Sequence, residues 1–303
     1  MHTSGAKSLR IEQASQHGQA AALGLLLSRI PDGDRPRHVD AWAAVLATGQ
    51  AHLWIAQRLG KLAGTILAQV QPGRTAVVLP PRQIADEPTE TSDALLTHVA
   101  EMARSEGVKL LQAALRPDER DDACRFAAAG YHHVSDLSYL VSLNGCFPSV
   151  VPQSALEFVP CSATGMKRLA RMVEQSYQGS LDCPPVDGHR AIDDVLAGYR
   201  AIGQFDASHW LVARHEQRDV GCLLLGDHPG ENGCELIYMG LKPAARGRQF
   251  GLALVRHAQW LTARAGRSRL TTAVDEANAP AIAIYRATQF IEYDRREVWL
   301  KVP

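Results

Sequence analysis

A pattern that occurs twice is the strongest constraint on the fold of this 303-residue chain. The segments His52-Leu-Trp-Ile-Ala-Gln and Gly60-Lys-Leu-Ala-Gly-Thr-Ile-Leu resemble His209-Trp-Leu-Val-Ala-Arg and Val220-Gly-Cys-Leu-Leu-Leu. A closing aromatic residue follows the first histidine by 79 positions (Tyr131) and the second by 81 (Phe290). Such self-similarity at one spacing predicts two copies of a single structural unit.

Strand-like and helix-like segments alternate in each copy, which predicts an α+β chain. In the first copy we expect strands at 8–12, 52–57, 62–71, 75–79, 109–114 and 134–143, and helices at 20–30, 39–48, 93–106 and 119–129. In the second copy we expect strands at 156–159, 209–214, 220–225, 235–241 and 269–274, and helices at 163–177, 191–199 and from 251. The predicted domains are 1–145 and 156–303, with a proline-bearing linker at 146–155.

The composition argues against several kinds of partner. Basic and acidic residues balance at 32 each, so we expect neither a nucleic-acid nor a membrane partner. Residues 1–10 lack the apolar segment of a signal peptide, and we predict a cytoplasmic protein. The six cysteines form no Cys-x-x-Cys pair, and His132-His133 has no further ligand at suitable spacing, so we predict neither a metal site nor a disulfide framework.

The segment from 235 to 253 combines an apolar strand, a glycine-bearing turn and a helix start. Amides at a helix start have no intrahelical partner and carry the positive end of the helix dipole, so this arrangement favours an anion such as phosphate. Gly247 and Gly251 remove side chains that would keep a ligand from the backbone. The turn also carries three basic residues, Lys242, Arg246 and Arg248. The alternative is an ordinary tight turn before a surface helix.

The same turn resembles the pyrophosphate loop of the GNAT family of acetyl-CoA-dependent N-acetyltransferases, Arg/Gln-x-x-Gly-x-Gly/Ala. Arg246-Gly-Arg-Gln-Phe-Gly251 matches at the first and last positions. Gln249 stands where the first glycine is usual, and we expect it to take an ordinary right-handed backbone conformation. A second family element resembles Asn278, followed by a helix carrying Tyr285 and closing on Phe290. The resemblance implies an α+β (α/β) fold of two tandem GNAT-like units, each a mixed, mostly antiparallel sheet flanked by helices.

The resemblance implies acetyl-CoA as cosubstrate and a set of residues that bind it. The strand at 235–241 is implied to diverge from the strand at 269–274, so that the arm of CoA pairs with backbone groups in the gap. An amide near Leu241 would then hold the acetyl oxygen. The implied cofactor-binding residues are Met239, Gly240, Leu241, Arg246, Gly247, Arg248, Gln249, Phe250, Gly251, Leu252, Ala253 and Asn278.

Acetyl transfer to an amine requires a base for the amine and benefits from a proton for the departing thiolate. Glu235, eleven residues before Arg246, resembles the family's general base; alternatively it is a strand-edge glutamate paired with an arginine. Tyr285 resembles the general acid, the alternative being a tyrosine that caps the core. Asn278 resembles the residue that binds the pantetheine arm, and it is equally an ordinary N-cap residue.

The first copy departs from the second where this chemistry is expected. Residues 79–106 contain no glycine, and Phe126, five residues before its closing aromatic, stands in place of Tyr285 without a hydroxyl. We therefore predict a degenerate N-terminal half without a donor site.

The acceptor is the least constrained part of the prediction. Residues 176–189 connect two predicted helices and contain four polar residues that could contact a cationic or polar acceptor: Tyr177, Asp182, Asp187 and His189. A solvent-exposed connector explains these residues equally well. The leading hypothesis is an N-acetyltransferase for a small-molecule or peptide amine, possibly a homodimer. The alternative from another class is a non-catalytic acyl-CoA-binding or regulatory protein. A dinucleotide-binding oxidoreductase fits poorly, because its three-glycine fingerprint follows the first strand of a βαβ unit.

Overall fold

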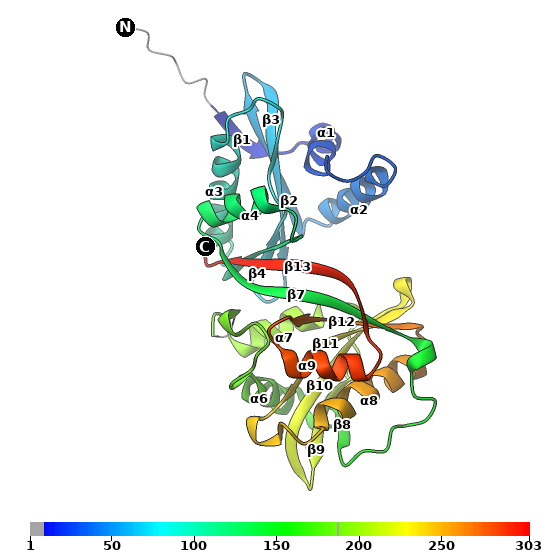
Figure 1. Cartoon of the computed structure of the whole chain (residues 1–303). Coiled ribbons are helices and arrows are strands. Elements are labelled where there is room, and N and C mark those ends of the chain that lie inside the picture. Colours follow the sequence, from blue (N-terminus) through cyan, green and yellow to red (C-terminus); the bar gives the residue numbers. More distant parts are fainter. Residues whose placement is uncertain (1–8, 187) are drawn as a thin grey trace. The chain divides into compact units, whose positions relative to one another are not determined.

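The computed structural model describes residues 9–186 and 188–303 and consists of two compact units (Figure 1). Unit 1 contains the chain up to His133 and the last residues, Val298–Pro303, whereas unit 2 contains Val134–Glu297. The first residue of the strand predicted at 8–12 and the acceptor candidate Asp187 lie outside the described residues. Within the described ranges, no helix is long and apolar enough to cross a membrane.

Unit 1 is a sheet with helices on both faces. Its strands follow the order β1-β2-β3-β4-β6, and the pairs are antiparallel except for β4 with β6, which is parallel. The short β5 pairs with β3. The elements are β1 (Leu9–Gln13), α1 (Gln16–Leu26), α2 (Arg35–Ala47), β2 (Ala51–Arg58), β3 (Lys61–Gln71), β4 (Thr75–Val78), β5 (Arg82–Gln83), α3 (Glu90–Ser105), β6 (Leu110–Leu115) and α4 (Arg120–Ala128).

The core of unit 1 follows from the alternation of side chains along its strands. Leu53 and Leu67 pack with α1 and α2 on one face of the sheet. Trp54 and Ile66, the neighbouring residues, pack with α3 and α4 on the other face, together with the buried Phe126. Both faces are therefore covered, and the central strands β2 and β3 are mostly apolar.

Unit 2 repeats this plan, with sheet order β13-β7-β12-β11-β10-β9-β8. Leu223 and Leu236 pack under α8 and α9, whereas Trp210 and Val212 pack under α6 and α7. The elements are β7 (His132–Leu143), β8 (Glu157–Pro160), α5 (Cys161–Thr164), α6 (Met166–Tyr177), α7 (Ile192–Arg200), β9 (Trp210–His215), β10 (Arg218–His228), β11 (Gly233–Leu241), α8 (Phe250–Arg264), β12 (Arg269–Asp275), α9 (Ala279–Ala287) and β13 (Ile291–Lys301). The predicted fold class is confirmed, since each unit is a largely antiparallel sheet flanked by helices.

The compact units do not coincide with the predicted domains 1–145 and 156–303. The strand β7, which ends the first copy in sequence, pairs with β12 of the second copy in an antiparallel register from Arg269↔Leu143 to Asp275↔Leu137. In return, the last residues of β13 belong to unit 1. The first copy thus contributes its final strand to unit 2, whereas β13 stays in unit 2 as far as Glu297, and the boundaries fall at 133/134 and 297/298.

Three predicted helices also differ at their ends. The helix predicted at 20–30 is α1, which runs from Gln16 to Leu26. The helix predicted at 163–177 is divided into α5 and α6 by Gly165, whose φ of 82° lies in the left-handed region that ends a helix. The helix predicted at 39–48 begins four residues earlier, at Arg35, with Pro36 in its first turn. A proline is favourable there because its missing N–H has no helical partner in that turn.

Candidate active site

The predicted divergence of two central strands of unit 2 is observed. The parallel strands β11 and β12 pair only from Gly233–Glu235 to Arg269–Thr271. The last link between them is a hydrogen bond of 3.0 Å from the Thr272 hydroxyl to the carbonyl of Leu236. Beyond this point β11 stays paired with β10 as far as Leu241, so its other edge borders a gap.

The gap opens into a cavity of about 690 Å³. Its walls are residues 236–241 of β11, the turn before α8 and the loop after α6. Residues 272–274 of β12 and several residues of α9 complete the lining. Ten of the predicted site residues line it: Met239, Gly240, Leu241, Arg246, Gly247, Gln249, Phe250, Gly251, Asn278 and Tyr285. Four predicted site residues are not among those lining it: Glu235, Arg248, Leu252 and Ala253.

The backbone of β11 presents hydrogen-bonding groups to the gap. Lys242 donates its N–H to the carbonyl of Val220 on β10 at 2.9 Å. Successive residues of a strand direct their backbone groups alternately to either side, so Leu241 and Met239 direct theirs away from β10. The cavity therefore has a strand edge along one wall, where the backbone groups of Met239 and the N–H of Leu241 take part in no hydrogen bond of the described residues, whereas the Leu241 carbonyl accepts from Arg246.

The turn before α8 provides a second set of donors. No hydrogen bond of the described residues takes up the backbone N–H groups of residues 247–252. Gly247 has a φ of 74°, and Gln249, the N-cap residue, has a φ of 59° in the left-handed region. The expectation of a right-handed Gln249 was wrong, because the turn requires here the conformation that glycine adopts most easily.

The side chain of Arg246 is engaged by the protein rather than free for an anion. Its guanidinium donates to the carbonyls of Ser176, Gln178 and Gly179 at 2.7–2.9 Å and to that of Leu241 at 3.2 Å. These bonds tie the end of α6 to the end of β11. Arg248 lies outside the cavity, where it contacts the ring of Phe250 and the Nε2 atom of a histidine, His215. The guanidinium of Arg246 is thus engaged by carbonyls and Arg248 does not line the cavity, so the predicted anion site would depend on backbone amides.

Two glycines permit close packing around the cavity. A Cβ atom on Gly240 would lie 2.7 Å from the Cβ of Ser176 and 2.7 Å from the hydroxyl oxygen of Tyr238. A Cβ on Gly251 would lie 2.6 Å from the Cδ1 of Ile284 on α9. Gly240 is therefore a site of close approach, as predicted, although the strand bulge itself lies at Ile237, between the pairs Leu225↔Leu236 and Leu224↔Tyr238.

Tyr285 lies on α9 with its ring against Phe290, and its hydroxyl points to the Thr272 hydroxyl at the inner end of the gap. Burial raises the pKa of Tyr285 well above its usual value, despite the hydrogen bond with Thr272 that lowers it. The hydroxyl is therefore protonated at neutral pH and can donate a proton. Asn278 lines the same cavity and is also the N-cap of α9, accepting the N–H of Ala281 at 3.3 Å.

Glu235 is not among the residues that line the cavity. Its carboxylate lies 3.3 Å from the Nε2 atom of His228. Burial raises the pKa of Glu235, and the proximity of His228 opposes that rise. The bulge at Ile237 follows Glu235 and reverses which face the later side chains of β11 occupy, because it adds one residue to the strand. Leu236 and Met239 consequently share the face under α8, and Glu235 faces the other side.

Of the three predicted acceptor residues that the structure describes, Asp182 lines the cavity and the other two do not. Tyr177 packs instead in a cluster with Tyr199 and Tyr238, its hydroxyl 3.0 Å from that of Tyr199. His189 is exposed. The sequence did not predict Thr272 and Tyr238 as residues of the site. The alternation of side chains along β12 and β11 places both polar side chains at the gap only when the pairing register of the strands is known.

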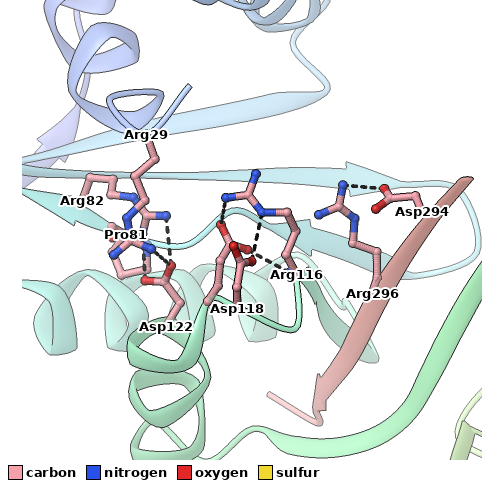
Figure 2. Close-up of polar contacts among 9 residues, drawn as sticks. Arg29, Pro81, Arg82, Arg116, Asp118, Asp122, Asp294 and Arg296 are labelled. Carbon is pink, nitrogen blue, oxygen red and sulfur yellow. Dashed lines mark hydrogen bonds and ion pairs between the residues drawn. The ribbon is translucent and has the colours of Figure 1, made fainter. Parts of the chain in front are cut away.

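The equivalent position in unit 1 is occupied by an ion cluster. The strand register shows which residues of the two copies correspond. Thr65 pairs with Arg82 in unit 1, and Cys222 pairs with Gly240 in unit 2, so Arg82 corresponds to Gly240. Asp122, four residues before Phe126, corresponds in the same way to Ala281, four before Tyr285. Figure 2 shows Arg82 and Arg29 pointing to Asp122, which accepts hydrogen bonds at 2.8 and 3.0 Å from Arg82 and at 2.6 Å from Arg29. Where unit 2 has two small cavity-lining residues, unit 1 has a buried salt bridge.

Comparison with known proteins agrees with this fold. Residues 174–290 match the family model described as Acetyltransferase (GNAT) family. A GCN5-related N-acetyltransferase from Sphaerobacter thermophilus is 16% identical, with a TM-score of 0.61 over 97% of this chain and 95% of that one. A tandem GNAT protein from the clavulanic acid biosynthesis pathway is 18% identical, with a TM-score of 0.55 over 97% and 98%. A fungal GCN5-related glucosamine N-acetyltransferase region is 14% identical, with a TM-score of 0.63 over 97% of this chain and 38% of that one.

No curated protein matches the sequence. The fold and the family model nevertheless define a class, that of proteins with the acyltransferase fold of the GNAT enzymes. Residues 174–290 match the GNAT family model, and the whole chain has a fold similar to that of a tandem GNAT protein.

Proposed function

We propose that this protein is an acetyl-CoA-dependent N-acetyltransferase whose active site is the cavity of unit 2, and whose acceptor is an amine of a small molecule or a peptide. The observation that carries the proposal is the joint presence of three features in one cavity: a splayed strand edge, a turn of unpaired amides at a helix start, and a buried protonated tyrosine. The acyltransferase fold of residues 174–290 supports it.

In this proposal the chain binds each part of the donor with a different element. The amides of residues 247–252 bind the diphosphate, because a helix start favours an anion. Met239 and Leu241 pair with the pantetheine arm through their backbone groups, and the Leu241 N–H stabilises the charge that develops on the acetyl oxygen. Tyr285 gives its proton to the departing thiolate. The base role predicted for Glu235 requires intervening water, since its carboxylate does not line the cavity.

Unit 1, in our proposal, binds no donor. The salt bridge of Arg82 and Asp122 occupies the position of the gap, and Pro81, which corresponds to Met239, has no N–H to offer an extended ligand. The N-terminal half then supports the active unit and supplies its strand β7. We also place the activity in the cytoplasm, since all six cysteines are free thiols.

The donor is tested first by thermal shift with acetyl-CoA, NAD and ATP. We expect stabilisation by acetyl-CoA; stabilisation by another nucleotide and none by acetyl-CoA would contradict the proposal. A panel of primary amines, including amino sugars, polyamines and peptides, is then assayed for release of free CoA thiol. Acetyl-CoA binding without any turnover would favour the alternative, a non-catalytic acyl-CoA-binding protein.

The catalytic role of Tyr285 is tested by Tyr285→Phe, which removes only the hydroxyl. We expect kcat to fall about 10²–10⁴-fold, the contribution typical of a positioned proton donor, with binding of acetyl-CoA retained. The matched control is Tyr131→Phe, which changes a buried tyrosine in unit 1. An unchanged kcat in Tyr285→Phe would remove Tyr285 from the mechanism.

A further inference from the structure

Arg246 joins two walls of the cavity that come from distant parts of the sequence. Its backbone begins the turn before α8, and its side chain reaches the end of α6. The Nη1 atom donates to the carbonyl of Gly179 at 2.7 Å. The Nη2 atom donates to the carbonyls of Ser176 at 2.9 Å and Gln178 at 2.8 Å, and Nε donates to that of Leu241 at 3.2 Å. One guanidinium therefore connects the end of α6 with the end of β11.

Backbone dipoles compensate the charge of this guanidinium. In the part of the chain that the structure describes, Arg246 makes no ion pair, and its hydrogen-bond partners are four carbonyl oxygens. The last carbonyls of a helix have no intrahelical partner and carry the negative end of the helix dipole, so they attract a cation. A guanidinium can bind several of them together because its N–H groups form a rigid planar fork.

The loop that Arg246 holds is one wall of the cavity, since residues 179–182 line it. The other end of this loop is attached to β12. Asp182 accepts the backbone N–H of Asp275 at 3.2 Å, and the carboxylate of Asp275 accepts the N–H of Cys183 at 3.1 Å. The loop is thus held at two points, and its position relative to the turn before α8 depends on Arg246.

We propose that Arg246 is a positioning residue that couples the turn before α8 to the loop at 178–183, so that a donor bound to the turn also orders the loop. This inference rests on the proposed function, in which the amides of residues 247–252 bind the diphosphate. These amides directly follow Arg246 in sequence. A diphosphate that fixes them also fixes the backbone that carries the guanidinium, and with it the three carbonyls at the end of α6.

The coupling has a consequence for the second substrate. The loop carries Asp182, the predicted acceptor residue that lines the cavity. In the proposed function, donor binding therefore prepares the wall that the acceptor contacts. Because coupling between two binding sites is reciprocal, an acceptor that orders the loop raises the affinity for the donor by the same factor.

The opposite response would follow if the guanidinium turned from the carbonyls to the bound diphosphate. Arg246 would then release the end of α6, and the loop would become less ordered. The four hydrogen bonds oppose this movement, because it would leave carbonyls of Ser176, Gln178 and Gly179 without their partner. The two responses change the hydrogen exchange of the loop in opposite directions.

The test is amide hydrogen exchange of the full chain, followed by mass spectrometry with and without saturating acetyl-CoA. One peptide covers the loop at 178–183, and a second covers the turn at 247–252. Arg246→Gln removes the charge and the planar fork, whereas Arg246→Lys keeps the charge without the fork. The matched control is Arg256→Gln, which changes an exposed arginine of α8.

We expect acetyl-CoA to slow exchange in both peptides of the native chain and of Arg256→Gln. In Arg246→Gln, the loop should exchange about tenfold faster without the donor, as for the loss of a hydrogen bond to a charged group. Acetyl-CoA should still protect the turn of this variant but no longer the loop. Arg246→Lys should lie between the two. With an amine that the thiol-release panel identifies, Arg246→Gln should raise KM for the amine more than KM for acetyl-CoA.

Loop exchange in Arg246→Gln equal to that in Arg256→Gln would overturn the inference. Loop protection by acetyl-CoA that persists in Arg246→Gln would overturn it as well, because the donor would then order the loop by direct contact. So would a loop that exchanges faster when acetyl-CoA binds to the native chain. If Arg246→Gln does not fold or does not bind the donor, Arg246→Lys decides by the same comparisons. Acetyl-CoA that protects neither peptide of the native chain would instead contradict the proposed function.

Discussion

The ion cluster of unit 1 leads to a sharp prediction about stability. The Asp122 side chain is only 3% exposed and accepts three hydrogen bonds from two arginines (Figure 2). The side chain of Arg82 is 13% exposed and that of Arg29 is 45% exposed. Because water reaches Arg82 less, its charge depends more strongly on the carboxylate of Asp122. The change Asp122→Asn keeps the shape of the side chain but removes its charge, which leaves a buried guanidinium without compensation.

Breaking a buried ion pair by removing one partner typically costs about 3–5 kcal/mol. The matched control is Asp219→Asn in unit 2, which breaks a bidentate pair with Arg168 whose side chains are 22% and 34% exposed. A pair this accessible to water contributes about 0–1 kcal/mol. Asp122→Asn should therefore destabilise its unit by several kcal/mol more than Asp219→Asn does.

The assay is urea denaturation followed by tryptophan fluorescence and circular dichroism. Because the chain has two units, the midpoint of each transition is compared, rather than one free energy for the whole chain. The double variant Arg82→Met with Asp122→Leu removes both charges and should recover most of the loss. Equal midpoints for Asp122→Asn and Asp219→Asn, or a double variant no better than Asp122→Asn, would refute the reasoning.

Three further predictions concern unit 2. Gly240→Ala should destabilise by about 1–3 kcal/mol, because its Cβ would overlap Ser176, and Ser176→Gly should recover stability when added to it in a thermal melt. Gln249→Gly should raise stability by about 0.5–1 kcal/mol and leave acetyl-CoA affinity unchanged, because it relieves a left-handed residue; a lower melting temperature would contradict this. Burial lowers the pKa of His257 to about 4, so below pH about 6.5 the unfolded chain binds a proton that the folded chain does not. Stability should then fall by about 3 kcal/mol from pH 6.5 to 4 and level off below, and His257→Gln should flatten that part of the pH profile of urea unfolding.

Much of the fold follows from the sequence because it depends on local patterns. The repeated spacing of His52 and His209 predicted two units, and the alternation of apolar residues located the central strands. The place of β7 in the sheet of unit 2 was not predictable in this way. The residues of β7 have the alternation of any half-buried strand, and nothing in that pattern specifies whether β6 or β12 is the neighbour.

The structure brings the backbone of the predicted site to one cavity, whereas several of the predicted side chains do not line it. A glycine-bearing turn before a helix is enough to predict where unpaired backbone amides lie, because their position depends on local geometry alone. The direction of a side chain such as Arg246 depends instead on carbonyls about 70 residues earlier in sequence, at Ser176 and Gln178. Glu235 does not line the cavity, and no glycine or proline of the strand signals the bulge at Ile237 that reverses the faces of the residues after it.

The central claim is that the gap between β11 and β12 holds the donor and that unit 1 holds none. Isothermal titration with acetyl-CoA tests it most directly, on the native chain and on Met239→Pro, which copies Pro81 of unit 1 and removes one N–H that faces the gap. We predict one site per chain, and an affinity about tenfold weaker in Met239→Pro, as expected for one lost hydrogen bond. Two sites per chain, no binding, or an unchanged affinity in Met239→Pro would contradict the account.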